Sequence, residues 1–167
     1  PRGRTLCIAE GEGRNAVFLA EHGHEVVAVD SSAVGLEKAE RLASERGVKI
    51  ETVVVDLVHF DIEPDSWDAV VSIFAHVPAD IRIPLHKKTA HGLRGGGMLV
   101  LEAYTPKQIE LGTGGPAVAE MTMSLDALQQ ELEGLVFKHA VELQRDVVEG
   151  RFHTGKGAVV QVVAVKP

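Results

Sequence analysis

Two glycines, Gly11 and Gly13, lie between a short apolar stretch and a segment with helical spacing, and an acidic residue, Asp30, ends the next apolar stretch. Glycine lets the backbone turn tightly and approach a ligand closely, because a side chain would occupy the space that the ligand needs. A carboxylate at the end of the second strand can accept hydrogen bonds from both hydroxyls of a ribose. This order of strand, glycine loop, helix, strand and acid predicts a site for a nucleotide-type ligand.

The elements that must position these residues alternate between strand and helix. Strands are expected at residues 5–9, 25–29, 49–55, 67–74 and 98–104, and helices at residues 14–22, 33–45 and 81–93. The glycines at 95–97 are expected to form the turn that closes the last of these helices. Strands that are separated by helices and almost continuously apolar are typical of a parallel sheet covered on both faces.

The pattern changes after Tyr104. Residues 106–123 contain glycines and prolines without a clear period, which predicts a long loop. This loop could form a lid or a substrate wall, or it could simply connect two elements. Ser124 is expected to cap a helix that continues through Leu132.

The last part of the chain contains two runs of β-forming residues, 136–148 and 158–165, with no helix between them. They are expected to pair as an antiparallel hairpin joined by residues 149–157. The sequence therefore predicts an α/β fold with a Rossmann-like, doubly wound, mostly parallel sheet that ends in an antiparallel β-hairpin.

With these elements the chain resembles class I S-adenosylmethionine-dependent methyltransferases over its whole length, and it is similar to the group that includes tellurite-resistance proteins. The resemblance is carried by residues 9–16 (AEGEGRNA), 28–32 (AVDSS), 56–57 (DL) and 95–97 (GGG). It implies S-adenosylmethionine as the cofactor and methyl transfer to a small molecule, such as a thiol or a metalloid oxyanion. The first motif of the family usually has an acidic residue and another glycine where this chain has Cys7 and Ala9.

The resemblance also implies a set of cofactor contacts. These are Glu10, Gly11, Gly13, Arg14, Asn15, Asp30, Ser31, Asp56, Leu57 and Phe74. Asp56 and Leu57 would face the adenine, although Asp56 could instead cap the loop after the third strand. Arg14 is unfavourable beside the positive end of a helix unless an anion is near, and the carboxylate of the cofactor would supply one. Otherwise Arg14 is a solvated residue of the first turn.

His76 and Tyr104 are the candidate catalytic residues. His76 follows the fourth strand, at the edge where open α/β sheets bind ligands. Histidine can act as a base or as a substrate contact near neutral pH, and a structural role is the alternative. A methyl group on a sulfonium is already activated, so alignment of the acceptor supplies much of the acceleration. An alcohol or amine acceptor would need a base, for which His76 or Tyr104 is available.

Composition limits the other possibilities. The 167 residues suffice for one domain, and the net charge of −7 without a basic stripe argues against nucleic acid as a partner. The one cysteine, Cys7, is expected to be a buried, inert thiol, and no metal site is expected. No apolar run approaches the roughly 20 residues that cross a bilayer, so no membrane partner and a cytoplasmic location are expected.

We expect residues 1–167 to form a single methyltransferase-like domain without the helices that, in this family, commonly precede the first strand and cover the cofactor. Two other functions are open. Gly11, Gly13 and Ala16, followed by Asp30, also fit the fingerprint of an NAD(P)-dependent oxidoreductase, although the final hairpin and the lack of a second domain count against it. The other alternative is a non-catalytic cofactor-binding module. The identity of the acceptor and the oligomeric state stay open.

Overall fold

The computed structural model describes residues 2–148 and 154–167. Its strands are β1 (Arg4–Ile8), β2 (Glu25–Asp30), β3 (Glu51–Val54), β4 (Trp67–Ile73), β5 (Leu93–Tyr104), β6 (Val136–Val148) and β7 (Thr154–Val165). Its helices are α1 (Arg14–Glu21), α2 (Ala33–Glu45), α3 (Ala79–Gly92), α4 (Gln108–Leu111) and α5 (Leu125–Glu131), with a 3-10 turn η1 at Ala119–Met121.

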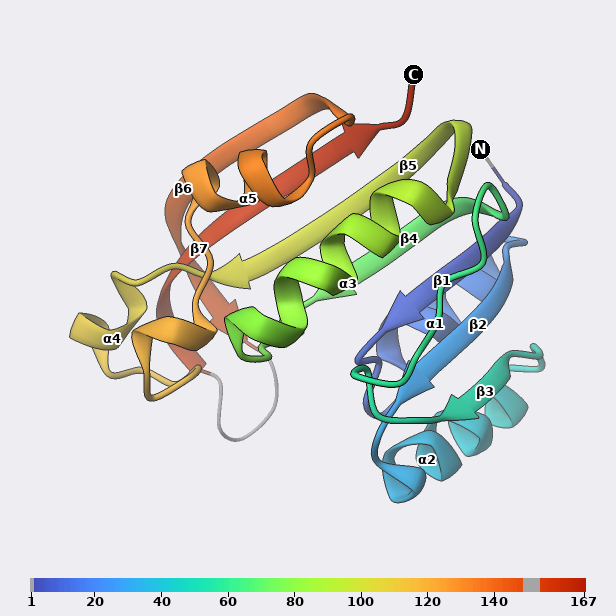
Figure 1. Cartoon of the computed structure of the whole chain (residues 1–167). Helices are drawn as coiled ribbons and strands as arrows, with labels where there is room; N and C mark the ends of the chain where they lie inside the picture. The colour runs from blue at the N-terminus through green and yellow to red at the C-terminus, as the bar shows by residue number, and fades with distance from the viewer. Residues whose placement is uncertain (1, 149–153) are drawn as a thin grey trace.

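The described strands form one sheet in the order β3-β2-β1-β4-β5-β7-β6 (Figure 1). The first five strands run parallel, whereas β7 is antiparallel to both β5 and β6. This arrangement confirms the predicted mostly parallel sheet with a terminal antiparallel hairpin. The part of the hairpin connection at 149–153 lies outside the described residues.

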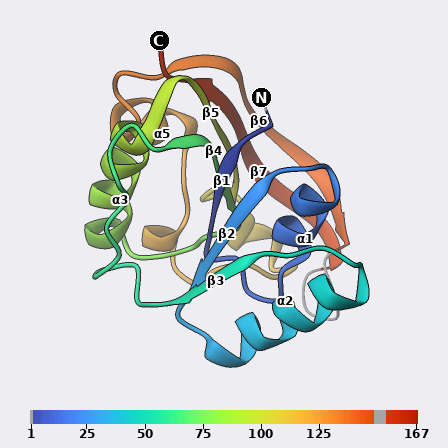
Figure 2. The same cartoon turned by 90° about the vertical axis from the view of Figure 1, so that its right-hand side faces the viewer.

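Helices cover both faces of the sheet. Figure 2 shows α3 and α5 on one side and α1 and α2 on the other. Successive residues of β1 supply both layers, because Leu6 and Ile8 belong to one buried apolar cluster while Cys7 belongs to the other. A strand that is buried on both faces needs a continuous apolar run, which explains the pattern of the sequence.

Two expected connections are wrong. The glycines at 95–97 lie inside β5 instead of in a turn, and the pairing of β4 with β5 shifts its register between Trp67 and Ala69. A Cβ atom at Gly97 would lie only 2.9 Å from the carbonyl oxygen of Trp67, so the glycine permits close approach of the two backbones. Residues 106–123 are also not a continuous loop, since they contain α4 and η1.

The helix expected after Ser124 is confirmed, and it is α5. The Ser124 side chain caps it by accepting a hydrogen bond from the backbone N–H of Ala127. In Figure 1, α4 and η1 lie beyond the carboxyl end of β5. No helix in residues 2–148 or 154–167 is long and apolar enough to cross a membrane.

Candidate active site

A cavity of about 620 Å³ lies where the parallel strands end. Its described lining comes from the loop after β1 and the start of α1 (Ala9, Glu10, Gly11, Arg14, Asn15), the end of β4 (Ile73, Phe74, His76), the end of β5 (Tyr104) and the segment before α5 (Gly115, Pro116, Met121). The structure therefore brings the predicted glycine loop and both candidate catalytic residues to one cavity. The carboxyl edge of an open parallel sheet is the usual position for a ligand.

Asp30 fixes the glycine loop to the end of β2. Its Oδ2 accepts a hydrogen bond from the backbone N–H of Gly11 at 2.9 Å, and its Oδ1 accepts one from the N–H of Ser32 at 2.8 Å. A carboxylate offers about four lone-pair positions, so each oxygen can accept a further donor. Asp30 can thus hold the loop and still bind the hydroxyl groups of a ligand.

The two glycines of the loop have different surroundings. Both have positive φ, 64° at Gly11 and 86° at Gly13, where a side chain is unfavourable. A Cβ atom at Gly13 would lie 2.5 Å from that of Ala39 on α2. A Cβ atom at Gly11 would have no described atom within 4 Å beyond the residues next to it in the chain. Gly13 therefore permits packing of the loop against α2, while Gly11 borders the cavity.

Glu10 is almost completely buried at the start of α1. Its Oε1 accepts hydrogen bonds from the backbone N–H groups of Asn15 and Ala16, each at 2.8 Å. Burial raises the pKa of Glu10 above its usual value, although these two hydrogen bonds oppose the shift. The first turn of α1 also presents Arg14 to the cavity, so an acid and a base border the same end of it.

Five of the predicted contacts lie outside the described lining of the cavity: Gly13 and Asp30, described above, and Ser31, Asp56 and Leu57. Ser31 is exposed, and Leu57 packs against the core. Asp56 Oδ1 accepts a hydrogen bond from the backbone N–H of Val58 at 3.0 Å, as a loop cap would. The end of β3 is nevertheless adjacent to Asp30, whose carbonyl accepts a hydrogen bond from the N–H of Val55. Contact of these residues with an adenine remains a prediction.

Phe74, His76 and Tyr104 form an aromatic cluster beside the glycine loop. The ring centroids of Phe74 and Tyr104 are 4.6 Å apart, and those of His76 and Tyr104 are 5.4 Å apart. Phe74 has a φ of 55°, and Ala9, which stands where the family usually has glycine, has a φ of 52°. Both residues are thus held in the left-handed region at the cavity wall, which costs energy for a side-chain-bearing residue.

Both ring nitrogens of His76 contact the backbone. Its Nδ1 lies 2.9 Å from the carbonyl oxygen of Met121, and its Nε2 accepts a hydrogen bond from the N–H of Tyr104 at 3.4 Å. These contacts assign the ring proton to Nδ1 and make His76 a link between β4, β5 and η1. To accept a proton from a substrate, Nε2 would have to release the amide of Tyr104.

The sequence left open whether residues 106–123 form a substrate wall or only a connection, and the structure places Gly115, Pro116 and Met121 of this segment in the lining of the cavity. Sequence reasoning missed a buried charged group that supports this segment, made by Arg82 and His86 of α3 and Glu131 of α5. The sequence does contain a signal for this group. Arg82 and His86 lie at helical spacing with Leu85 and Thr89, which places all four on the buried face of α3.

The sheet order, the glycine loop with its acid and the cavity at the strand ends define a class I methyltransferase fold. A family model described as "Methyltransferase domain" matches residues 6–97, more than half of the chain, and the chain belongs to this family. S-adenosylmethionine is therefore the cofactor of its class, as predicted.

Two curated relatives agree with this assignment. The chain is 31% identical over 106 residues to the uncharacterized methyltransferase YbaJ of Bacillus subtilis, covering 62% of this chain and 41% of that protein. It is 31% identical over 105 residues to the tRNA 5-carboxymethoxyuridine methyltransferase of Escherichia coli K12, covering 60% of this chain and 40% of that protein. The matched regions thus span about two fifths of the length of these relatives.

Solved structures show the same fold. TehB from Haemophilus influenzae superposes with a TM-score of 0.80 at 18% identity, covering 98% of this chain and 57% of that chain. A SAM-dependent methyltransferase from Methanosarcina mazei superposes with a TM-score of 0.78 at 18% identity, covering 98% of this chain and 92% of that chain. At this identity the likeness concerns the fold, and a place in the tellurite-resistance group stays a prediction.

Proposed function

We propose that this chain binds S-adenosylmethionine and transfers its methyl group to a small-molecule acceptor. The observation that carries the proposal is that the glycine loop and the aromatic cluster line the same cavity, in a member of the methyltransferase domain family. Such an arrangement can hold two reactants side by side, and alignment is the main requirement of methyl transfer from a sulfonium.

The charged residues suggest how the cofactor lies. Asp30 would accept hydrogen bonds from the ribose hydroxyls with the lone pairs that Gly11 and Ser32 leave available. Arg14 would attract the carboxylate of the methionine portion, and Glu10 would attract its ammonium group, since both side chains border the cavity. Asp56 and Leu57, one strand beyond Asp30, would contact the adenine.

The other side of the cavity would hold the acceptor. Among the described residues that line it, Arg14 carries the one permanent positive charge, and it lies in the first turn of α1. Phe74, Tyr104 and Met121 instead provide aromatic and thioether surface. This wall favours a thiol over a metalloid oxyanion. An oxyanion would lose its hydration in the cavity without gaining a cationic partner, which is unfavourable. A thiol that ionises readily needs no strong base from the protein.

The test begins with calorimetric titration of the purified protein with S-adenosylhomocysteine and, separately, with NADH. We expect binding of the first and none of the second. Methyl transfer from labelled S-adenosylmethionine is then measured with a panel of small thiols, selenite, tellurite and bulk tRNA. Transfer to a thiol supports the proposal, and transfer to tRNA alone would replace the small-molecule acceptor. Binding of NADH in place of S-adenosylhomocysteine would refute the proposal, and binding without any transfer would indicate a non-catalytic module.

A further inference from the structure

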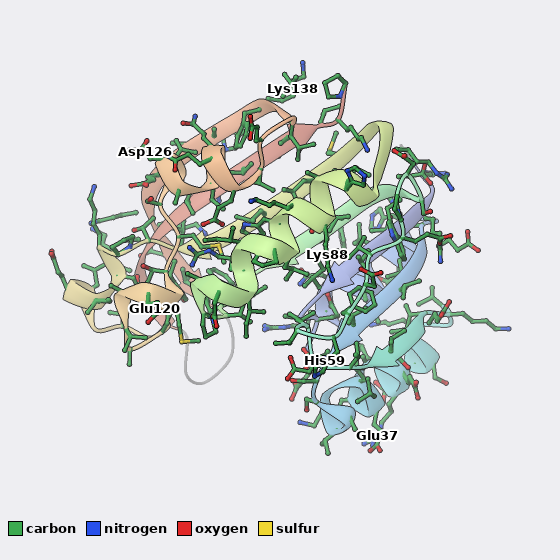
Figure 3. The ribbon with its side chains drawn as sticks, viewed as in Figure 1. Glu37, His59, Lys88, Glu120, Asp126 and Lys138 are labelled. Carbon is green, nitrogen blue, oxygen red and sulfur yellow. The ribbon has the colours of Figure 1, made fainter. Side chains whose placement is uncertain are left out.

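Three successive backbone carbonyls in the wall before α5 are each held by a buried or half-buried side chain. Nη1 of Arg82 donates hydrogen bonds to the carbonyl oxygens of Glu120 at 3.2 Å and Thr122 at 3.1 Å. Nδ1 of His76 contacts the carbonyl oxygen between them, that of Met121, at 2.9 Å. Figure 3 labels Glu120 on this turn, beside the start of α3. The backbone around Met121 is thereby fixed on both sides of the residue that reaches the cavity.

Arg82 is itself held rigidly. Its Nε and Nη2 donate to the carboxylate of Glu131, at 3.1 Å to Oε2 and 2.9 Å to Oε1, and the two side chains are 8% and 7% exposed. Nδ1 of His86, one helical turn after Arg82, lies 2.6 Å from Oε2 of the same carboxylate. One edge of the guanidinium therefore binds the carboxylate of Glu131 on α5, and the remaining nitrogen donates to the backbone carbonyls of the turn.

A buried ion pair of this kind is a poor way to gain stability, because removing both charges from water costs as much as their attraction returns. Its geometry is more informative than its energy. A guanidinium can bind a carboxylate with two nitrogens and still direct a third, in the same plane, at other acceptors. An ammonium group cannot do both, since its donors radiate from a single atom.

We propose that Arg82 is a positioning residue for the acceptor: by fixing the carbonyls of Glu120 and Thr122, it holds the side chain of Met121 as the wall against which the acceptor is aligned. This inference rests on the proposed function, because it takes the cavity to hold cofactor and acceptor together. It assigns a functional role to a side chain that lies outside the described lining of the cavity.

A purely structural role would join α3 to α5 without affecting Met121. Arg82→Lys separates the two roles, because a lysine can keep the charge beside Glu131 but cannot also reach both carbonyls. Arg94→Lys is the matched control, since Arg94 pairs with Asp68 on the surface and has no contact with the cavity. Glu131→Gln is a second variant, which preserves shape while weakening the hold on Arg82.

The three methionines of the chain, Met98, Met121 and Met123, allow a direct readout. Protein labelled with ¹³C at the methionine methyl groups is compared by NMR, with Met98 in β5 as the internal reference. In Arg82→Lys we expect the Met121 signal to sharpen and to move toward the position of a free methionine, while Met98 and the Arg94→Lys spectrum stay unchanged. For a thiol that the panel identifies as an acceptor, KM should rise about tenfold, with the Kd of S-adenosylhomocysteine within about twofold of the parent.

An unchanged Met121 signal in folded Arg82→Lys and Glu131→Gln would overturn the proposal. So would loss of the folded state in both variants, seen by circular dichroism, because it would assign Arg82 to holding α3 against α5. Failure of the proposed function is distinguishable, since it is a failure of the parent protein to bind S-adenosylhomocysteine or to transfer a methyl group. The NMR comparison does not depend on either.

Discussion

Asp30 has an observed role in the fold beside the ligand contact that we propose for it. Its two oxygens hold the N–H groups of Gly11 and Ser32, so the carboxylate shapes the loop before any ligand is present. The ribose contact that we propose uses the remaining lone pairs. Replacement by alanine would disturb both roles, whereas asparagine keeps the shape of the side chain and one oxygen acceptor.

We therefore expect Asp30→Asn to weaken binding of S-adenosylhomocysteine by about 1–2 kcal/mol, because charge-assisted hydrogen bonds to the ribose become neutral ones. Calorimetric titration measures the change. Asp61→Asn is the control, since Asp61 is exposed and its side chain pairs with Lys88, away from the cavity. Equal affinities of the parent and a folded Asp30→Asn protein would refute the ribose contact.

Substitutions at Gly11 and Gly13 can separate the energetic cost of the left-handed backbone conformation from the cost of steric overlap. Both have positive φ, so an alanine at either position costs about 1–2 kcal/mol in the left-handed region. At Gly13 the added Cβ also collides with Ala39 on α2, and such overpacking typically costs a further 1–3 kcal/mol. Gly13→Ala should thus lower the melting temperature more than Gly11→Ala does, as thermal unfolding would show. The opposite order would contradict the assigned packing role.

His76 is the residue for which catalytic and positioning roles differ most clearly. We expect His76→Ala to lower the methyl-transfer rate more than the affinity for S-adenosylhomocysteine, because the link to Met121 is lost. His76→Asn, whose amide nitrogen can replace Nδ1, should restore most of the rate. If His76→Asn instead loses a hundredfold or more of kcat and the near-neutral limb of the pH profile, His76 acts as a general base. Steady-state kinetics across pH decides between the two.

At the scale of elements, α3 and α5 are joined through the buried group of Arg82, His86 and Glu131. Burial by itself would raise the pKa of Glu131, but hydrogen bonds from His86 and Arg82 outweigh it and lower the pKa to about 2. The ordinary value is 4.5, so the folded state favours the ionised carboxylate. The resulting stability is complete above pH 4.5 and is lost as the pH falls toward 2.

Glu131→Gln should consequently be less stable than the parent at pH 7, by an amount on the order of 2 kcal/mol, and the difference should shrink between pH 4.5 and pH 2. Urea unfolding at a series of pH values measures it. Glu133→Gln is the control, because Glu133 is exposed two residues away. A stability difference that stays constant down to pH 2 would show that the charge of Glu131 does not stabilise the contact.

At the scale of the whole molecule, the parallel strands direct their carboxyl ends to one edge, where segments distant in the sequence form the cavity. The glycine loop after β1, the aromatic residues after β4 and β5, and Met121 before α5 meet there. The antiparallel β7 extends the sheet beyond β5, and its partner β6 forms the outer edge. The glycine-loop end of the cavity is therefore built from local motifs, and the Met121 end from long-range contacts.

The sequence by itself determined the fold class and the glycine loop with its acid. Periodicity, continuous apolar runs and turn residues are local signals, and they located the strands, the helices α1, α2, α3 and α5 and the cap at Ser124, but not α4 or η1. The loop at Gly11 and its partner Asp30 could be recognised for the same reason, since both belong to one strand, helix and strand unit.

Only the tertiary structure decided the cavity wall at Met121. Arg82 and Glu131 are 49 residues apart, and His76 and Met121 are 45 residues apart, so no local pattern connects them. The glycines at 95–97 were assigned to a turn because their role depends on the backbone of β4, a different strand. Sequence pattern reports what each segment prefers by itself, whereas contacts between segments follow from how the sheet and its helices pack.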